Sequence, residues 1–310
     1  MIVEDVTFFN HGIQLTGSLY EPQGPAPYPT LIVLHAANGG TRQFPFYQHL
    51  ITHLPMQGLA VLLYDRRGSG KSTGDFETSD FDDLAGDALA AIAYLSSRKD
   101  IDNRRIGVYG ISQGGWIAPI VAAQRPTVAS LIIVSGCGVS PAKQMDYAAR
   151  YTLRAMGYSE DVVAQAIALR NRLNEYYRGN LSYEKVKADI DHIRNESWFQ
   201  FTYIVDGEQL PKDVTQDKWC YELDFDPLPI WHQVHQPTLF FFAEEDRWVP
   251  VKESLSLFRA ATKHLKDVTF MRIEGTDHLM YEKNGNATTR ISGRYVEVLL
   301  AWLNERLRQV

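Results

Sequence analysis

The sequence predicts an α/β fold in which helices cover both faces of a mostly parallel, eight-stranded sheet. Short apolar runs rich in Val, Ile and Leu alternate with segments of helical period, which is typical of parallel strands buried on both faces. The alternation stops between about residues 141 and 228, where the period is helical, aromatic residues are frequent and no convincing buried strand occurs. We therefore expect a helical insertion after the sixth strand.

Eight segments are predicted as strands. The first two, residues 3–9 and 13–20, alternate in polarity and are separated by Asn10, His11 and Gly12, which predicts an antiparallel hairpin at the sheet edge. The other six are apolar runs, at residues 30–34, 59–64, 105–109, 130–134, 238–242 and 268–273.

Helix signals occur between these runs and inside the insertion. Asp80 and Asp83 open an apolar stripe that ends near Leu95, and acidic residues suit the positive end of a helix. In the insertion, Ser159 is placed to cap a helix and Gly179 follows its end. The apolar stripe of that helix consists of Val162, Ala166, Leu169, Leu173 and Tyr176. A last amphipathic helix is expected over about residues 291–307.

Composition limits the class of protein. The chain has 310 residues, of which 45% are hydrophobic and 22% charged, as in ordinary globular proteins. The net charge of −6 is spread without long blocks, so we expect no nucleic-acid partner. The two cysteines, Cys137 and Cys220, indicate neither a disulfide framework nor a CxxC pattern. Without a signal-like start or a run of about 18 apolar residues, we expect a cytoplasmic protein with no membrane insertion.

One serine lies on a turn between a predicted strand and a predicted helix. The run at residues 105–109 leads into Gly110-Ile111-Ser112-Gln113-Gly114-Gly115-Trp116, and a helical run follows. A serine there must sit on a sharp turn, and the glycines two residues to either side relieve the crowding. The Gly-x-Ser-x-Gly pattern alone is weak, but its placement predicts a nucleophile at Ser112.

A serine hydroxyl is a poor nucleophile until a neighbouring base removes its proton. Among nine histidines, His278 is the best placed, because a short loop separates it from the run at residues 268–273. That position puts His278 at the same sheet edge as Ser112.

With these motifs the chain resembles the α/β-hydrolase superfamily, in particular its capped serine esterases and serine aminopeptidase-like members, over nearly all residues outside the insertion. The resemblance implies a base after the last strand, which His278 matches, and an acid shortly before a Val-Pro pair, which Asp246 matches. The order Ser, Asp, His is also that of the superfamily. Glu244 and Glu245 stay open as rivals for the acid, and Asp277 is expected to cap or solvate its own loop.

An acyl-transfer site also needs backbone N–H groups aimed at the oxyanion. Gln113, immediately after the nucleophile, is expected to supply one. The resemblance places the second on Ala37, in the loop after the third strand. Because Ala36 stands where family members usually carry glycine, Asn38 is the alternative donor. We expect His35 to brace this loop rather than to act as a second base.

Two other patterns suggest ligand sites. Residues 65–72 end in Gly-Lys-Ser, but position 65 is Asp where a phosphate-binding loop needs glycine. The same stretch resembles the D-x-R-G-x-G-x-S turn of α/β-hydrolases, so we expect a structural role. His232 and His235 lack further ligands at a recognisable spacing. We therefore predict neither a metal nor a cofactor.

The resemblance also gives the insertion a role. It implies a core domain of residues 1–140 and 229–310, with residues 141–228 as a helical cap that lies over Ser112, excludes water and shapes an acyl pocket. The aromatic residues that could line or pack this cap are Tyr147, Tyr151, Tyr176, Tyr177, Trp198, Phe199, Phe201 and Tyr203.

The predicted function is hydrolysis of a small-molecule carboxylic ester through an acyl-enzyme on Ser112. Thioester hydrolysis uses the same groups and stays open. The alternative is a serine aminopeptidase, because the run from Ser112 to Trp116 resembles that of some of these peptidases. A third hypothesis, from another class, is a ligand-binding protein that keeps the fold and hydrolyses little. The sequence indicates neither the acyl specificity nor the oligomeric state.

Overall fold

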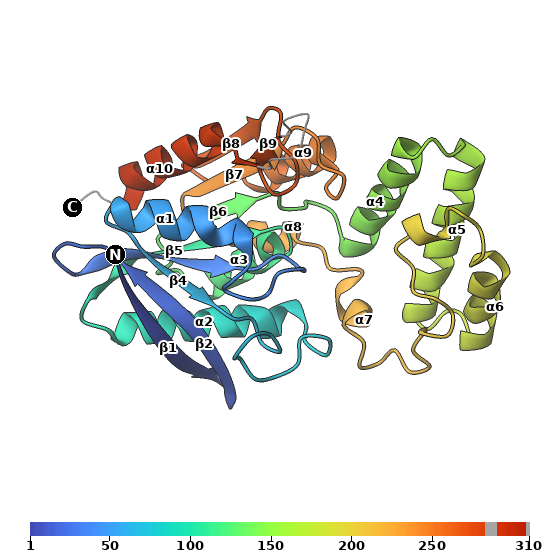
Figure 1. Ribbon diagram of the computed structural model, residues 1–310, viewed down its shortest axis with the longest axis horizontal. Helices are drawn as coiled ribbons and strands as arrows, with labels where there is room; N and C mark the ends of the chain where they lie inside the picture. Colours follow the sequence, from blue (N-terminus) through green and yellow to red (C-terminus); the bar gives the residue numbers. More distant parts are fainter. Residues whose placement is uncertain (283–289, 308–310) are drawn as a thin grey trace. The chain divides into compact units, whose positions relative to one another are not determined.

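The structure is a computed structural model that describes residues 1–282 and 290–307 (Figure 1). The chain divides into two compact units. The first comprises Met1–Gly138, Pro227–Asp246 and Val251–Val310, and the second comprises Val139–Asp226 with Arg247–Pro250. No sequence pattern predicts that the four residues after Asp246 group with the second unit.

The first unit contains an eight-stranded sheet, as predicted. Its strands, in spatial order, are β1 (Ile2–Asn10), β2 (Ile13–Glu21), β4 (Ala60–Tyr64), β3 (Tyr28–Leu34), β5 (Ile101–Ile111), β6 (Ser130–Val134), β7 (Thr238–Ala243) and β8 (Val268–Ile273). Strands β1, β2 and β4 pair antiparallel, and all later neighbours pair parallel. The edge hairpin is confirmed: His11 and Gly12 both have positive φ, as a two-residue type I′ turn requires.

Helices cover both faces of this sheet (Figure 1). On one face, α1 (Gln48–Met56) and α10 (Gly293–Leu307) share a hydrophobic core with the strands. The other helices of this unit are α2 (Phe81–Ser97), α3 (Gly114–Gln124), α8 (Leu228–Trp231) and α9 (Val251–Ala261), with a 3₁₀ turn η1 at Pro45–Tyr47.

Strand β7 shows how one apolar run packs against helices on both faces of the sheet. The Phe241 ring lies 4.8 Å from Tyr295 of α10, between ring centroids. Its neighbour Phe240 points to the opposite face and lies 4.9 Å from Phe258 of α9 and 5.0 Å from Trp231 of α8. Successive side chains of a strand alternate between faces, so a continuous apolar run needs two covering layers.

Two predicted boundaries need correction. Strand β5 begins at Ile101, four residues earlier than predicted, because Ile101 pairs with Tyr28 across a register shift. The last helix begins at Gly293 rather than at residue 291. The preceding residues, Arg290–Ile291, form the short strand β10 and pair with β9 (Tyr281–Glu282). Two-residue strands are too short to leave a periodic signal.

The second unit is helical and has its own cores. It contains α4 (Pro141–Ala155), α5 (Glu160–Tyr177), α6 (Tyr183–Ile193), η2 (Phe199–Phe201) and α7 (Lys218–Glu222). Ser159 caps α5, as predicted, by accepting from the N–H of Val162. Arg170 of α5 donates to Asp146 of α4 at 2.8 Å, which ties these two helices together.

Of the eight aromatic residues singled out above, four are buried in this unit: Tyr176, Tyr177, Trp198 and Phe199. They pack the unit itself. Within residues 1–282 and 290–307, no helix combines the length and apolar character needed to cross a bilayer. The role of the second unit as a cap over Ser112 stays a prediction.

Candidate active site

Ser112 lies on a strained turn between β5 and α3. Its φ is 52°, in the left-handed region that side chains other than glycine rarely adopt. A Cβ at Gly110 would lie 2.2 Å from the carbonyl oxygen of Gly114, and a Cβ at Gly114 would lie 2.5 Å from that of Leu34. Both glycines of the pattern are therefore required. The turn leaves Ser112 half-buried, with solvent access.

A path of hydrogen bonds joins the strand ends around this turn. The N–H of Ser112 donates to the carbonyl of Val134 at 2.9 Å, at the end of β6. The next residue, Ser135, donates its N–H to Phe241 of β7 at 2.9 Å and its hydroxyl to the carbonyl of His278 at 2.7 Å. Ser112 and His278 are thus anchored at one edge of the sheet.

Sequence reasoning missed Ser135. It is fully buried and has a φ of 49°, so it is a second strained residue beside Ser112. The available signal was a polar residue directly after the apolar run at 130–134 and before Gly136. Such a position marks the carboxyl end of a parallel strand, where ligand sites of open α/β sheets gather.

His278 and Asp246 form a hydrogen-bonded pair. The distance from His278 Nδ1 to Asp246 Oδ2 is 2.7 Å, and the Asp246 side chain is fully buried. A carboxylate only accepts hydrogen bonds, so Nδ1 carries the proton and the Nε2 lone pair is left to accept another. In the described part of the chain, the Ser112 hydroxyl and the His278 ring form no hydrogen bond with each other. Catalytic hydrogen bonds are often long before substrate binds.

The neighbouring acids have other partners. Glu244 accepts the N–H of Gly275 at 2.8 Å through its carboxylate. Asp277 accepts the N–H groups of Leu279 and Tyr281, both at 3.0 Å, as expected of a residue that caps its own loop. These carboxylates therefore shape the loop that carries the base.

His35 braces the loop after β3. Its Nε2 lies 2.5 Å from the carbonyl oxygen of Tyr64, so Nε2 must donate, and its Nδ1 then accepts from the Tyr47 hydroxyl at 2.9 Å. Burial lowers the pKa of His35 to about 4, which keeps the ring neutral at ordinary pH. With both nitrogens occupied, His35 cannot serve as a second base.

The expected oxyanion donors lie close to one arginine. Gln113 is the N-cap residue of α3, and Ala37 and Asn38 are exposed in the loop after β3. Arg66 Nη1 lies 3.0 Å from the carbonyl oxygens of both Ala36 and Ala37 and 3.5 Å from Gln113 Oε1. The role of these N–H groups in catalysis stays a prediction.

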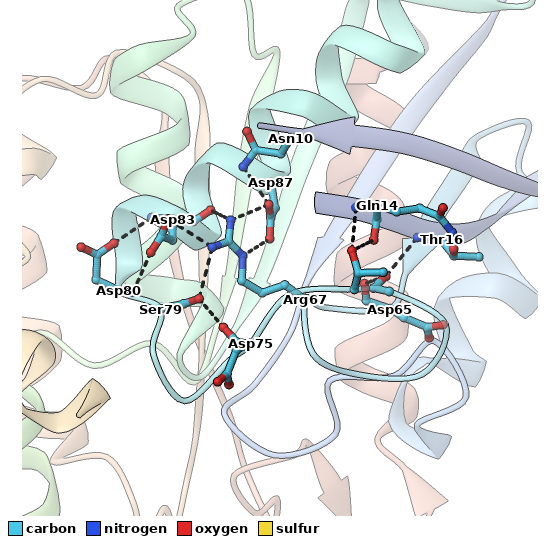
Figure 2. A network of polar contacts seen from close by, with 12 residues as sticks. Asn10, Gln14, Thr16, Asp65, Arg67, Asp75, Ser79, Asp80, Asp83 and Asp87 are labelled. Carbon is cyan, nitrogen blue, oxygen red and sulfur yellow. Dashed lines mark hydrogen bonds and ion pairs between the residues drawn. The ribbon is translucent and has the colours of Figure 1, made fainter. Parts of the chain in front are cut away.

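The turn at residues 65–72 is structural. The Arg67 guanidinium donates two hydrogen bonds to the Asp87 carboxylate, at 2.7 and 2.8 Å (Figure 2). The Asp65 carboxylate accepts the N–H of Lys71 at 3.0 Å, and the Ser72 hydroxyl donates to the Asp65 carbonyl at 2.6 Å. Two groups that a phosphate loop would aim at its ligand, the Lys71 N–H and the Ser72 hydroxyl, are thus committed to the turn itself.

His232 and His235, the two histidines considered above as metal ligands, lie on the surface. The rings of His232 and His235 lie 6.2 and 5.6 Å from that of His264, and all three residues are exposed. His264 Nε2 donates to the carbonyl of Val234 at 2.7 Å. Among the residues that the structure describes, no group of three or more His, Cys, Asp or Glu side chains is arranged to hold a metal ion.

Comparisons with known proteins place this chain in a family. A profile of the X-Pro dipeptidyl-peptidase (S15) family matches residues 11–279. The quorum-quenching protein AidA of Acinetobacter baumannii is 30% identical over 132 residues, which cover 41% of this chain and 42% of that protein. Esterase EstD of Thermotoga maritima is 20% identical over 306 residues, which cover 93% of this chain and 65% of that protein.

The solved structure of proline iminopeptidase from Mycobacterium smegmatis matches with a TM-score of 0.62 at 18% identity, over 98% of this chain and 99% of that one. At that identity the likeness shows the fold alone. The chain spans about two fifths of the length of the first curated relatives that it matches. The family profile covers most of the chain, from the edge hairpin to the loop that carries His278. The chain therefore belongs to the X-Pro dipeptidyl-peptidase (S15) family, within the α/β-hydrolase superfamily.

Proposed function

We propose that the chain hydrolyses carboxylic esters through an acyl-enzyme on Ser112, with His278 as the base and Asp246 as the acid that orients it. The observation that carries this proposal is the 2.7 Å hydrogen bond from His278 Nδ1 to the buried Asp246 carboxylate. It leaves Nε2 of the base unprotonated, at the sheet edge where Ser112 stands on its strained turn.

In the first half-reaction, the Ser112 hydroxyl attacks the ester carbonyl and its proton passes to His278 Nε2. The imidazolium is stabilised by the Asp246 carboxylate, which stays ionised. When the tetrahedral intermediate collapses, the C–O bond to the alcohol breaks and the alcohol leaves with the proton from Nε2. The serine is then acylated, and the base is neutral again.

In the second half-reaction, water attacks the acyl-enzyme and gives a proton to His278 Nε2. Collapse of this intermediate releases the acid and returns the proton to Ser112. The N–H groups of Gln113 and of Ala37 or Asn38 would face the oxyanion in both steps. Removal of one such donor costs about 3 to 4 kcal/mol in well-studied cases.

The substrate class has two candidates. Similarity to EstD over 93% of this chain supports an ester. The family profile supports a peptide with proline at its second position, since that is the substrate in the family's name. Amide cleavage needs the same groups but a more effective proton donor, because an amine leaves less readily than an alcohol. Thioester hydrolysis, a small-molecule substrate and a cytoplasmic location stay predictions.

The experiment compares wild type with Ser112→Ala on short and long p-nitrophenyl esters and on Gly-Pro p-nitroanilide. Faster turnover of the esters than of the anilide, with this activity lost in Ser112→Ala, would support the ester proposal. Faster turnover of the anilide than of the esters would favour a peptidase. Ser97→Ala, at the exposed end of α2, is the control and should match wild type.

Labelling by a fluorophosphonate adds a direct readout. The proposal predicts a covalent adduct on Ser112, found by mass spectrometry of the digested protein. If wild type and Ser112→Ala turn over every substrate equally, Ser112 is not the nucleophile. If wild type turns over no substrate and is not labelled, a ligand-binding role replaces the enzyme.

A further inference from the structure

Arg66 is a nearly buried arginine that contacts both expected halves of the oxyanion hole. Its side chain comes from the loop after β4, and the residue is 8% exposed. A single nitrogen, Nη1, lies 3.0 Å from the carbonyl oxygens of Ala36 and Ala37 and 3.5 Å from the side-chain oxygen of Gln113. One guanidinium therefore joins the loop after β3 to the residue that follows Ser112.

These contacts decide which way the neighbouring N–H groups point. In a planar trans peptide, the C=O of one residue and the N–H of the next point in opposite directions. The Ala36 carbonyl faces Arg66, so the N–H of Ala37 points away from it. The Ala37 carbonyl also faces Arg66, so the N–H of Asn38 points away as well. Both candidate donors are thus turned to the side opposite the guanidinium.

The contacts around Arg66 fix the orientation of its guanidinium plane. Its central carbon lies 3.3 Å from the centroid of the Phe76 ring. A Cβ at Gly40 would lie 2.8 Å from Arg66 Nε, so only glycine leaves room for this side chain. The N–H of Arg66 also donates to the Gly40 carbonyl at 2.8 Å. A flat group with five fixed donors suits this slot, whereas an ammonium does not.

We propose that Arg66 is a positioning residue that aims the N–H groups of Ala37 and Asn38 at the oxyanion and keeps Gln113 beside them. Its positive charge also polarises the two peptides, which strengthens their N–H groups as donors. This inference rests on the proposed function of Ser112.

The test uses Arg66→Lys and Arg66→Met, and Gly40→Ala as a variant that displaces the guanidinium while leaving Arg66 in the sequence. Kinetics use the best p-nitrophenyl ester. Binding uses a trifluoromethyl ketone with the same acyl group, whose adduct on Ser112 carries an oxyanion, and the carboxylic acid product, which forms no such adduct.

All three variants are expected to lose about 10- to 100-fold in kcat, with KM within about threefold of wild type, since mispositioned donors act on the transition state. Affinity for the ketone should fall in parallel with kcat/KM, while affinity for the acid stays within about twofold. A purely structural role would not separate the two ligands.

Arg67→Lys is the matched control, because the neighbouring arginine has the same charge but grips Asp87. It should lower the unfolding midpoint and leave the ratio of ketone to acid affinity unchanged. Ketone affinity within twofold of wild type in Arg66→Lys and Gly40→Ala would overturn the inference. A wild type that neither turns over ester nor is labelled at Ser112 would instead overturn the proposed function.

Discussion

The hydroxyl of Ser135 donates a 2.7 Å hydrogen bond to the backbone carbonyl of His278. This bond crosses from the end of β6 to the loop after β8. It reaches the peptide of the proposed base rather than its ring. The bond therefore fixes the backbone position of His278, while the ring nitrogen Nδ1 donates to Asp246.

Ser135→Ala and Ser135→Gly separate this bond from the strain at the same position. Both remove the hydroxyl, so both should lower kcat/KM on the best ester by roughly tenfold, as His278 loses its anchor. Only glycine relieves the positive φ, which costs other residues about 1 to 2 kcal/mol. Urea unfolding should therefore find Ser135→Ala less stable than wild type and Ser135→Gly close to it. Activity that tracked stability across the pair would rule out positioning.

Asp246→Asn tests the orientation of the base. An amide at this position can donate to the ring and favour the wrong tautomer, with the proton on Nε2. The expected loss is about 10⁴-fold in kcat, by analogy with the Asp-to-Asn change in a measured triad, with little change in KM. Steady-state kinetics on the ester measure it.

Glu244→Gln is the matched control for Asp246→Asn. The Glu244 carboxylate accepts the N–H of Gly275. The Glu244→Gln variant should keep kcat within about threefold of wild type. Equal losses in the two variants would mean that the acidic loop matters only as a whole, and Asp246 would lose its assigned role.

The fold was predictable because its signals are local. A buried parallel strand such as 130–134 is a continuous apolar run, and the edge hairpin has a turn residue that needs positive φ, Gly12. Ser112 and His278 could be named for the same reason, since each follows a recognisable strand. Their catalytic roles stay predictions.

The contacts of Arg66 and Ser135 could not be predicted from the chain. They depend on which strand ends are neighbours: β3 lies between β4 and β5, and β6 lies between β5 and β7. Arg66 and Arg67 are adjacent and chemically alike, yet one contacts the loop after β3 and the other binds Asp87. The D-x-R-G-x-G-x-S resemblance marks Arg67 as the arginine of the turn, but nothing in the sequence indicates which groups the Arg66 side chain contacts.

The stability of the protein should fall between pH 6.5 and pH 5 because of buried histidines. Burial lowers the pKa of His49 to about 4, and the ring donates from Nδ1 to the Phe46 carbonyl. Below pH 6.5 the unfolded chain binds a proton that the folded ring refuses, so the free energy of unfolding decreases as pH falls. From pH 6.5 to 5 the contribution of His49 is about 2 kcal/mol, and above pH 6.5 it is absent.

His49→Gln removes this proton-binding site. The free energy of unfolding in urea, measured from pH 7 to pH 5, should fall less steeply in the variant. His35, whose pKa burial also lowers to about 4, should keep a residual slope. Parallel pH profiles for wild type and His49→Gln would show that His49 titrates alike in the folded and unfolded chain.

Asp87→Asn should destabilise the turn that leads from β4 towards α2. Asp87 is 1% exposed, and its two carboxylate oxygens accept from Arg67, with Asn10 donating to one of them at 2.8 Å. The amide removes the buried counter-charge of Arg67, and removal of one partner of a buried pair costs about 3 to 5 kcal/mol. The half-exposed Asp83 carboxylate, 3.1 Å from Arg67 Nη1, offsets part of that cost. The free energy of unfolding in urea measures the loss.

Glu297→Gln breaks an exposed ion pair with Arg294 and serves as the control for Asp87→Asn. Solvent screens that pair, so the variant should unfold like wild type. Because Asp87 holds Arg67 and not Arg66, Asp87→Asn should leave the ratio of ketone to acid affinity unchanged, as Arg67→Lys does. An Asp87→Asn protein as stable as Glu297→Gln would mean that the backbone hydrogen bonds around Asp65 hold the turn by themselves.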